Sequence, residues 1–397
     1  MKKLGFGTMR LPLLNSEDPK SIDYKQFDEM VDHFLENGFT YFDTAYPYHG
    51  EVSEAAVKRC LVDRYPRESF VLADKMPIMR VKAAEDYQRF FDEQLKRCGV
   101  DYFDYYLLHN IGRDRYENTV KYGGFEFISK MKEKGYVGKI GFSFHDNAEL
   151  LDRVLTEHPE VDFVQLQINY LDWDSPVAQS GACYETAAKH NKPVIVMEPV
   201  KGGTLANLPP AAMEEYRRSC GKCENSGEYE NGKEYEKCEE DDKNGKYGGQ
   251  IPSPASYAVR YAASLDNVMM VLSGMSSMEQ LVDNVSYMKD FVPLNEQERQ
   301  MLARITDILN STVSIPCTNC KYCMEECPKN INIPAYFGLY NLHSVTGKKT
   351  NMYYERYKLN HGLASECIEC GRCEKICPQH INIRKNLKEF VDLYEKE

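Results

Sequence analysis

Eight short apolar segments alternate with eight longer amphipathic segments between residue 4 and about residue 290, and this alternation constrains the fold most strongly. The apolar segments read KLGFGTMRL, FTYFDTA, FVLADK, DYYLLH, KIGFSFH, FVQLQIN, PVIVMEP and VMMVLSG. The intervening helical patterns cover residues 22–37, 51–63, 82–98, 121–134, 147–157, 179–190, 254–264 and 277–288. Eight such units predict an α/β fold, a (β/α)8 TIM barrel. A doubly wound open sheet is the alternative, but no GxGxxG follows a predicted strand.

The charge and the apolar pattern narrow the classes of partner. Lys and Arg number 49 against 61 Asp and Glu, and this net charge of −12 disfavours nucleic acid or an anionic membrane surface. No apolar run approaches the length of a membrane span, and LGFGTMRLP is too short and broken for a signal-peptide core. We therefore expect a cytoplasmic protein, whose cysteines bind metal or stay free.

Two segments lie outside the alternation and suggest a division into domains. We predict a barrel over residues 1–292 that contains a polar insertion at 211–250. A linker helix, NEQERQMLARITDILN, is expected within 293–310, and a second domain over 311–397.

The second domain repeats a cysteine motif with a period of 50 residues, each copy reading C-x2-C-x2-C-x3-C-P. In this motif three thiolates hold one cubane cluster and the fourth ligates the partner cluster. One predicted [4Fe–4S] cluster takes Cys317, Cys320, Cys323 and Cys377, and the other takes Cys367, Cys370, Cys373 and Cys327. Zinc is disfavoured because its cysteine ligands usually come as two pairs at longer separation; free thiols are the other alternative.

This tail resembles the bacterial two-cluster ferredoxin module over about 70 residues. The resemblance implies a ferredoxin-like α+β domain. The 39 residues 328–366 between the motifs suggest an inserted helix within NMYYERYKLN.

Polar residues at the ends of the second, third and fourth predicted strands should converge at one mouth of the barrel. They are Asp43, Lys75 and His109, with Tyr48 in the loop after the second strand. Such a set can protonate an oxygen: Lys75 is expected to lower the tyrosine pKa, and a neutral imidazole can donate a hydrogen bond. The alternative is a structural ion pair of Asp43 with Lys75, with His109 as a strand cap.

The segments FDTAYPYHGE, VLADK and YLLHN resemble the aldo/keto reductase family, and the resemblance covers about residues 3–290. The family's four catalytic residues fall on Asp43, Tyr48, Lys75 and His109, called the tetrad below. Tyr48 is preferred to Tyr46 because it follows Asp43 by five residues, as in the family. With its tail, the whole chain resembles iron–sulfur-containing aldo/keto reductase-like proteins of anaerobic bacteria.

The resemblance also implies a nicotinamide site across the same face of the barrel. Ser143 and Gln165 would bond the nicotinamide amide, and Met197 takes the place of the tyrosine that stacks under the ring. The positions that would clamp the 2′-phosphate hold Gly274, Met275 and Gln280, and only Asn284 matches the family. Each missing charge-assisted contact is worth about 1.5–3 kcal/mol, so selectivity for NADP is not expected.

Nicotinamide transfers two electrons as hydride, whereas a [4Fe–4S] cluster passes one. We therefore expect a small organic substrate with a carbonyl or activated double bond, reduced by electrons that enter through the tail from a ferredoxin or flavodoxin. The alternatives are an NAD(P)H-dependent reductase with accessory clusters and a non-catalytic electron carrier. Use of both cofactors together would need an intermediary such as flavin or a substrate that tolerates single-electron steps.

The predicted insertion contains Cys220, Cys223 and Cys238, on the active-site side of a barrel. One C-x2-C pair with a third thiol suits free thiols, a zinc site or a third iron–sulfur cluster. Such a third cluster would have an open iron that acts as a Lewis acid.

Overall fold

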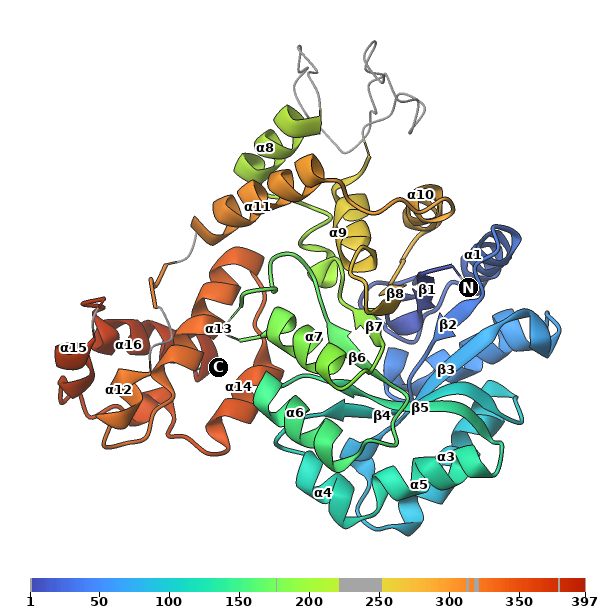
Figure 1. The fold of residues 1–397 in the computed structure, drawn as a ribbon, viewed down its shortest axis with the longest axis horizontal. Coiled ribbons are helices and arrows are strands. Elements are labelled where there is room, and N and C mark those ends of the chain that lie inside the picture. Colours follow the sequence, from blue (N-terminus) through green and yellow to red (C-terminus); the bar gives the residue numbers. More distant parts are fainter. Residues whose placement is uncertain are drawn as a thin grey trace.

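The computed structural model describes residues 2–175, 177–220, 252–311, 314–317, 321–377 and 379–396 (Figure 1). Eight parallel strands close into a barrel in sequence order, and each predicted apolar segment supplies one of them. The predicted TIM barrel is therefore confirmed. The strands are β1 Leu4–Gly7, β2 Tyr41–Asp43, β3 Val71–Met76, β4 Phe103–Ile111, β5 Val137–Phe144, β6 Phe163–Gln167, β7 Val194–Met197 and β8 Val268–Ser273.

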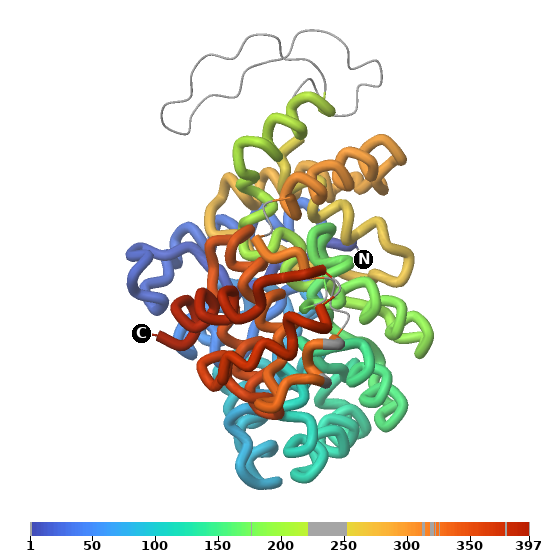
Figure 2. Tube along the Cα trace, turned by 90° about the vertical axis from the view of Figure 1, so that its left-hand side faces the viewer, coloured from blue at the N-terminus to red at the C-terminus, as the bar shows by residue number. Residues whose placement is uncertain are grey.

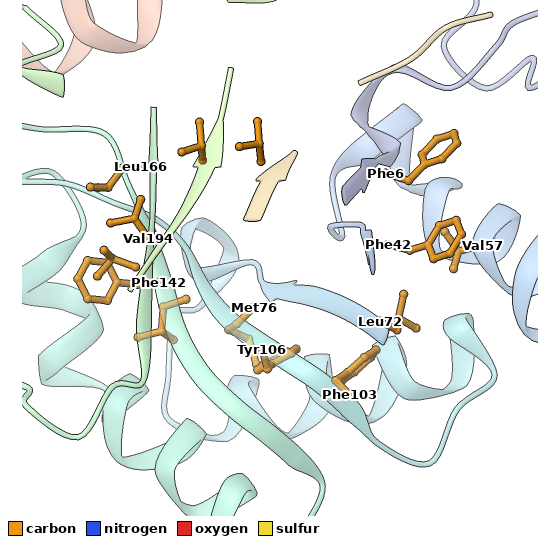
Figure 3. Packing of buried hydrophobic residues seen from close by; sticks show 14 of the residues in the cluster. Phe6, Phe42, Val57, Leu72, Met76, Phe103, Tyr106, Phe142, Leu166 and Val194 are labelled. Carbon is orange, nitrogen blue, oxygen red and sulfur yellow. The ribbon is translucent and has the colours of Figure 1, made fainter. Parts of the chain in front are cut away.

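Helices surround the barrel because each has one apolar face that packs on the outward side chains of the strands. Phe6, Phe42 and Leu72 belong to this buried layer between strands and helices (Figure 3). The helices are α1 Tyr24–Glu36, α2 Ser53–Val57, α3 Glu85–Cys98, α4 Tyr116–Lys121, α5 Gly124–Glu133, α6 Ala148–Glu157, α7 Ser180–Lys189, α9 Pro254–Ala263 and α10 Met278–Met288.

A separate layer of side chains fills the barrel interior, and its members include Tyr41, Ala73, Leu107, Phe163 and Ile195. Successive residues of a strand point to opposite faces, so the residue two positions further on faces inward again. Those positions are at the carboxyl ends of the strands, where the interior opens to the mouth. They hold Asp43, Lys75, His109, Gln165 and Met197.

The predicted insertion begins with a helix, and the predicted linker helix is packed against it. Helix α8, Pro210–Cys220, contacts α11, Glu296–Ser311. Tyr216 of α8, Tyr257 of α9 and Leu302 of α11 share one buried cluster. The predicted helix within 293–310 thus corresponds to α11, which lies against the barrel helices.

The tail is built from five described helices that surround a second core. The helix predicted within NMYYERYKLN is confirmed as α14. The β contribution among the described tail residues is one isolated bridge between Ile331 and Gly362. The five are α12 Tyr322–Glu325, α13 Ile333–Thr346, α14 Asn351–Lys358, α15 Arg372–Ile376 and α16 Ile383–Tyr394.

The tail lies against the side of the barrel, as Figure 2 shows from the tail side. Val177, in the loop after β6, belongs to the core of the tail. In Figure 1, α14 lies beside the barrel and α15 lies at the far end of the tail. No helix in the described ranges has both the length and the apolar character needed to cross a bilayer.

Candidate functional site

A buried ion pair forms the floor of the barrel mouth. Lys75 Nζ lies 2.5 Å from Asp43 Oδ1 and donates to the carbonyl oxygen of Thr44 at 2.7 Å. Gln165 Nε2 donates to the second carboxylate oxygen of Asp43 at 3.3 Å. Burial opposes the charge on Lys75, but Asp43 and Tyr48 outweigh it and raise the lysine pKa. The lysine therefore stays an ammonium ion at neutral pH.

Tyr48 and His109 complete the tetrad above this pair. Lys75 Nζ lies 5.0 Å from the centre of the Tyr48 ring, and the Tyr48 and His109 ring centres are 5.9 Å apart, edge to face. The structure thus brings all four predicted residues together.

The pKa shifts of Tyr48 and His109 compare differently with the sequence-based expectations. Burial raises the pKa of Tyr48 by more than Lys75 lowers it, so the expected net lowering is wrong. Burial, then the charge of Lys75, holds the pKa of His109 well below its usual value, which favours the neutral imidazole that the sequence predicts.

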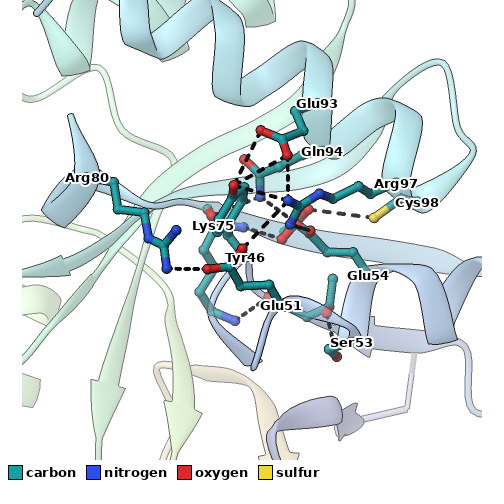
Figure 4. A network of polar contacts seen from close by, with 12 residues as sticks. Tyr46, Glu51, Ser53, Glu54, Lys75, Arg80, Glu93, Gln94, Arg97 and Cys98 are labelled. Carbon is teal, nitrogen blue, oxygen red and sulfur yellow. Dashed lines mark hydrogen bonds and ion pairs between the residues drawn. The ribbon is translucent and has the colours of Figure 1, made fainter. Parts of the chain in front are cut away.

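A network of buried polar groups supports Lys75 from outside the barrel (Figure 4). Gln94 Nε2 donates at 3.0 Å both to the carbonyl oxygen of Lys75 and to Glu54. Asp74 and Glu54 are fully buried, and burial with the neighbouring Glu54 raises the pKa of Asp74 well above its usual value. Cys98 Sγ lies 3.7 Å from Asp74. Burial and the neighbouring Glu54 therefore favour the protonated form of Asp74.

The residues predicted to bind nicotinamide divide into two groups. Ser143 and Gln165 lie beside the tetrad, where Ser143 Oγ accepts from the backbone N–H of Asn110 at 2.8 Å. Asn284 is buried, and its Nδ2 donates to Ser273 Oγ at 3.3 Å and to the Gln280 carbonyl at 2.9 Å. The side chain of Asn284, the one residue of the predicted phosphate-binding positions that matches the family, is therefore bonded within the protein.

Two cations that the sequence pattern did not single out lie at the loops after β7 and β8. The side chain of Arg10 covers Gly274, so that a Cβ there would lie 3.3 Å from Arg10 Cβ. Lys348, from the tail, donates to the Gly202 carbonyl at 2.8 Å. Positive charge is thus present at Gly202, where a Cβ would lie 3.2 Å from Arg10 Nη2 and 3.5 Å from Lys348 Nζ, although it comes from distant segments of the chain.

The tail cysteines gather around two cavities. Cys327, Cys367, Cys370 and Cys373 line one, called the second thiol cavity. Cys317, Cys323 and Cys377 line the other, called the first thiol cavity. Cys320 lies outside the described residues. Each cavity combines thiols of both motifs, as the crossed prediction requires.

Several thiols that line one cavity and come from both motifs suit a bound cluster, which is wider than a single ion. Within the described ranges, no group of three His, Cys, Asp or Glu side chains is placed to hold one metal ion. The thiols that line the cavities therefore suit an iron–sulfur cluster, and their placement does not suit a single metal ion.

The first thiol cavity is the one next to the barrel. Lys321 and Pro334 line both this cavity and an interdomain cavity of about 180 Å3. The interdomain cavity is also lined by Arg113 of the barrel and by Arg356 and Tyr353 of α14. Tyr353 Oη donates to Gln167 Oε1, at the end of β6, at 3.2 Å.

Cys220 ends α8 with its Sγ 3.6 Å from Tyr257 Oη and 3.8 Å from Met301 Sδ. Burial raises the pKa of this thiol. Cys223 and Cys238, the other two residues of the predicted third metal site, lie outside the described residues.

Comparisons with known proteins agree with this architecture. The model of the aldo/keto reductase family matches residues 3–307, and that of the 4Fe-4S dicluster domain matches residues 316–383. A probable aldo-keto reductase 1 of Glycine max is 28% identical over 188 residues, 45% of this chain and 51% of that protein. An aldo-keto reductase of Mycobacterium avium (strain 104) is 28% identical over 206 residues, 50% of this chain and 65% of that protein. The chain thus spans less than two thirds of these relatives.

Solved structures share the barrel fold. An aldo-keto reductase from Bacillus halodurans (holo form) has a TM-score of 0.55 at 21% identity, with 76% of this chain and 91% of that chain covered. An aldo-keto reductase from Klebsiella pneumoniae in complex with NADPH has a TM-score of 0.52 at 20% identity, with 77% and 90% covered.

Proposed function

The chain belongs to the aldo/keto reductase family, and we propose that it reduces a small organic substrate with electrons delivered singly through two [4Fe–4S] clusters. The substrate would carry a carbonyl group or an activated double bond. The observation that carries this proposal is the tetrad, with the Asp43–Lys75 pair under Tyr48 and beside a neutral His109.

Tyr48 is the proposed general acid. Its raised pKa keeps the phenol protonated at neutral pH, and the adjacent Lys75 ammonium stabilises the phenolate that proton donation leaves behind. Neutral His109 would donate a hydrogen bond to the same substrate oxygen. Reduction of a carbonyl to an alcohol takes up two electrons and two protons. Tyr48 gives one proton to oxygen, and solvent supplies the second proton and reprotonates Tyr48.

The clusters, when bound, would supply the electrons one at a time. The proposed ligands are Cys317, Cys320, Cys323 and Cys377 for the cluster beside the barrel and Cys367, Cys370, Cys373 and Cys327 for the outer one. Cys370 is exposed, so the outer cluster is the natural entry point for a ferredoxin or flavodoxin. A reducing cytoplasm, as in an anaerobic bacterium, would keep these thiols out of disulfides.

Substitution of Tyr48 by phenylalanine tests the acid role. The cluster-loaded protein is reduced anaerobically with methyl viologen and mixed with diacetyl or 2-cyclohexenone. We expect Tyr48→Phe to lower kcat by about 10²–10⁴-fold, while the clusters still bleach on reduction. Tyr46→Phe is the matched control, because the Tyr46 hydroxyl accepts from Arg97 at 3.1 Å, away from the tetrad. Unchanged turnover by Tyr48→Phe would show that Tyr48 is not the acid.

An NADPH-dependent reductase is the second candidate, and Arg10 favours it. The loops after the seventh and eighth strands of TIM barrels often bind phosphate. Arg10 covers Gly274 with the aliphatic part of its side chain, and its guanidinium group lies at Gly202, where a Cβ would be 3.2 Å from Nη2. Anaerobic titration with NADPH, NADH and reduced ferredoxin separates the candidates. Rapid cluster bleaching by NADPH alone, slowed by Arg10→Gln, would favour nicotinamide over a protein donor.

A further inference from the structure

We infer that Arg356, on α14 of the tail, is a positioning residue for His109, so that the barrel has its working geometry only with the tail docked. The inference rests on the proposed role of His109 at the substrate oxygen. It assigns the tail a second task besides carrying clusters.

Arg356 connects the tail to the two loops beside the tetrad. Its side chain is 2% exposed, and Nη2 donates to Asn110 Oδ1 at 2.6 Å. Its Nε donates to Asp114 Oδ1 at 2.9 Å, and Nη1 donates to the carbonyl oxygen of His145. The guanidinium group therefore holds the carboxyl end of β4 together with the segments that follow β4 and β5, and Asp114 balances its charge.

Asn110, which directly follows His109, is held from both sides. Its backbone is left-handed, with φ of 67°, and its N–H donates to Ser143 Oγ at 2.8 Å. Its side chain is held by Arg356 and contacts Met352 Sδ at 3.5 Å. Asparagine adopts a left-handed backbone more readily than most residues. The bonds between its side chain and the tail can therefore stabilise this backbone conformation.

Among the residues that the structure describes, none forms a side-chain hydrogen bond with His109 that could replace this support. Its Nδ1 is buried without a hydrogen-bond partner among the described residues. In many active sites, a carboxylate or carbonyl at the second ring nitrogen fixes the imidazole orientation. Here the orientation must come from the backbone at residues 109–110 and from the edge-to-face contact with Tyr48.

The backbone is shaped to admit Arg356. A Cβ on Gly112 would lie 2.6 Å from Arg356 Cζ, closer than any real contact. A Cβ on Gly338, in α13, would lie 2.5 Å from Val177 Cγ2 in the loop after β6. Two glycines thus permit the close approach of tail and barrel at this face.

The test compares Arg356→Gln and Arg356→Lys with a matched control, Arg113→Gln, in cluster-loaded protein. Arg113 also lies at the interface, 5.7 Å from the Tyr357 ring, but its guanidinium bonds Asp146. We expect faster hydrogen–deuterium exchange in residues 108–112 for Arg356→Gln and an unchanged pattern for Arg113→Gln. If residues 108–112 of Arg356→Gln exchange at the wild-type rate, the inference is overturned, whichever substrate the protein reduces.

Turnover gives the second readout, with reduced methyl viologen and the same two probes. We expect Arg356→Gln to lower kcat by at least about tenfold with KM nearly unchanged, since positioning acts on the chemical step. Arg356→Lys, which keeps the charge but has its N–H donors on a single nitrogen, should recover part of the rate. A rise in KM alone, or an equal loss in Arg113→Gln, would contradict positioning.

Two variants of Asn110 keep the test decisive if Arg356→Gln folds poorly. Asn110→Asp retains an acceptor for Arg356 and should keep kcat, whereas Asn110→Gly accepts the left-handed backbone but loses the bond and should reproduce Arg356→Gln. Inactivity of the wild type on both probes would count against the proposed function, and exchange would then decide the positioning inference by itself.

Discussion

Lys75 and Asp43 form an ion pair in which Nζ lies 2.5 Å from Oδ1, with both side chains almost fully buried. Each charged group is shielded from water, so each depends on the opposite charge of the other for its stabilisation. The pair therefore links two properties of the site, its stability and the acidity of Tyr48, and these can be separated by mutation.

Removal of Lys75 alone should damage both properties. In Lys75→Met, Asp43 is left as a buried unpaired charge, a defect that typically costs about 3–5 kcal/mol. The double variant Asp43→Asn/Lys75→Met should recover much of that stability but none of the turnover. Apparent Tm and kcat of the single and double variants check this. Recovery of kcat in the double variant would contradict a role for the lysine charge.

The pH profile of kcat should be flat through neutrality. Tyr48 must be protonated to act as an acid, and its raised pKa means that activity is lost only as pH rises into the alkaline range. His109 is neutral throughout because its pKa is well below the usual value. A decline near pH 7–8 that disappears in Tyr48→Phe would show that Lys75 lowers the tyrosine pKa more than burial raises it.

Asp74 should make the folded state less stable as pH rises. Its folded pKa is raised by burial and by Glu54, so the folded chain holds a proton that the unfolded chain releases above about pH 4. Stability is therefore lost between that pH and the raised pKa. Asp74→Asn should gain a few degrees in apparent Tm over the wild type between about pH 5 and 8, since about 1 kcal/mol shifts Tm by about 2–4 °C. An equal difference in apparent Tm between Asp74→Asn and the wild type at about pH 5 and at about pH 8 would contradict this.

Loss of either fourth cysteine should damage the cluster of the other motif. Cys377→Ala should disrupt the cluster in the first thiol cavity, and Cys327→Ala the cluster in the second. Iron analysis and low-temperature EPR of the reduced variants check this, with about four irons expected in each variant. Cys183→Ala is the control, since that thiol is buried in the barrel core. Loss of the cluster of the same motif would contradict the crossed assignment.

The wild type should contain about eight irons and as many acid-labile sulfides, with no zinc. The reason is the environment of Cys220, whose half-buried Sγ lies against Tyr257 and Met301 and whose pKa is raised by burial. Elemental analysis of the anaerobically purified protein measures this. A count near twelve would instead support the third cluster predicted at Cys220, Cys223 and Cys238.

Much of the fold and the site could be predicted from the sequence because their signals are local. Strand alternation determines which residues face the interior, so the positions of Asp43, Lys75 and His109 in their strands suffice to place them at one mouth. The repeat of the cysteine motif likewise predicts which thiols bind the same cluster, since ligand spacing follows from the size of a cluster.

Only the tertiary structure decided how distant segments meet. Arg356 reaches Asn110 across 246 residues of sequence, and Arg10 covers Gly274. No periodicity or spacing encodes such contacts, because they depend on how the tail and the loops pack. The pKa of Tyr48 has the same character: proximity to Lys75 could be foreseen, but the larger effect of burial depends on every neighbour that excludes water from the phenol.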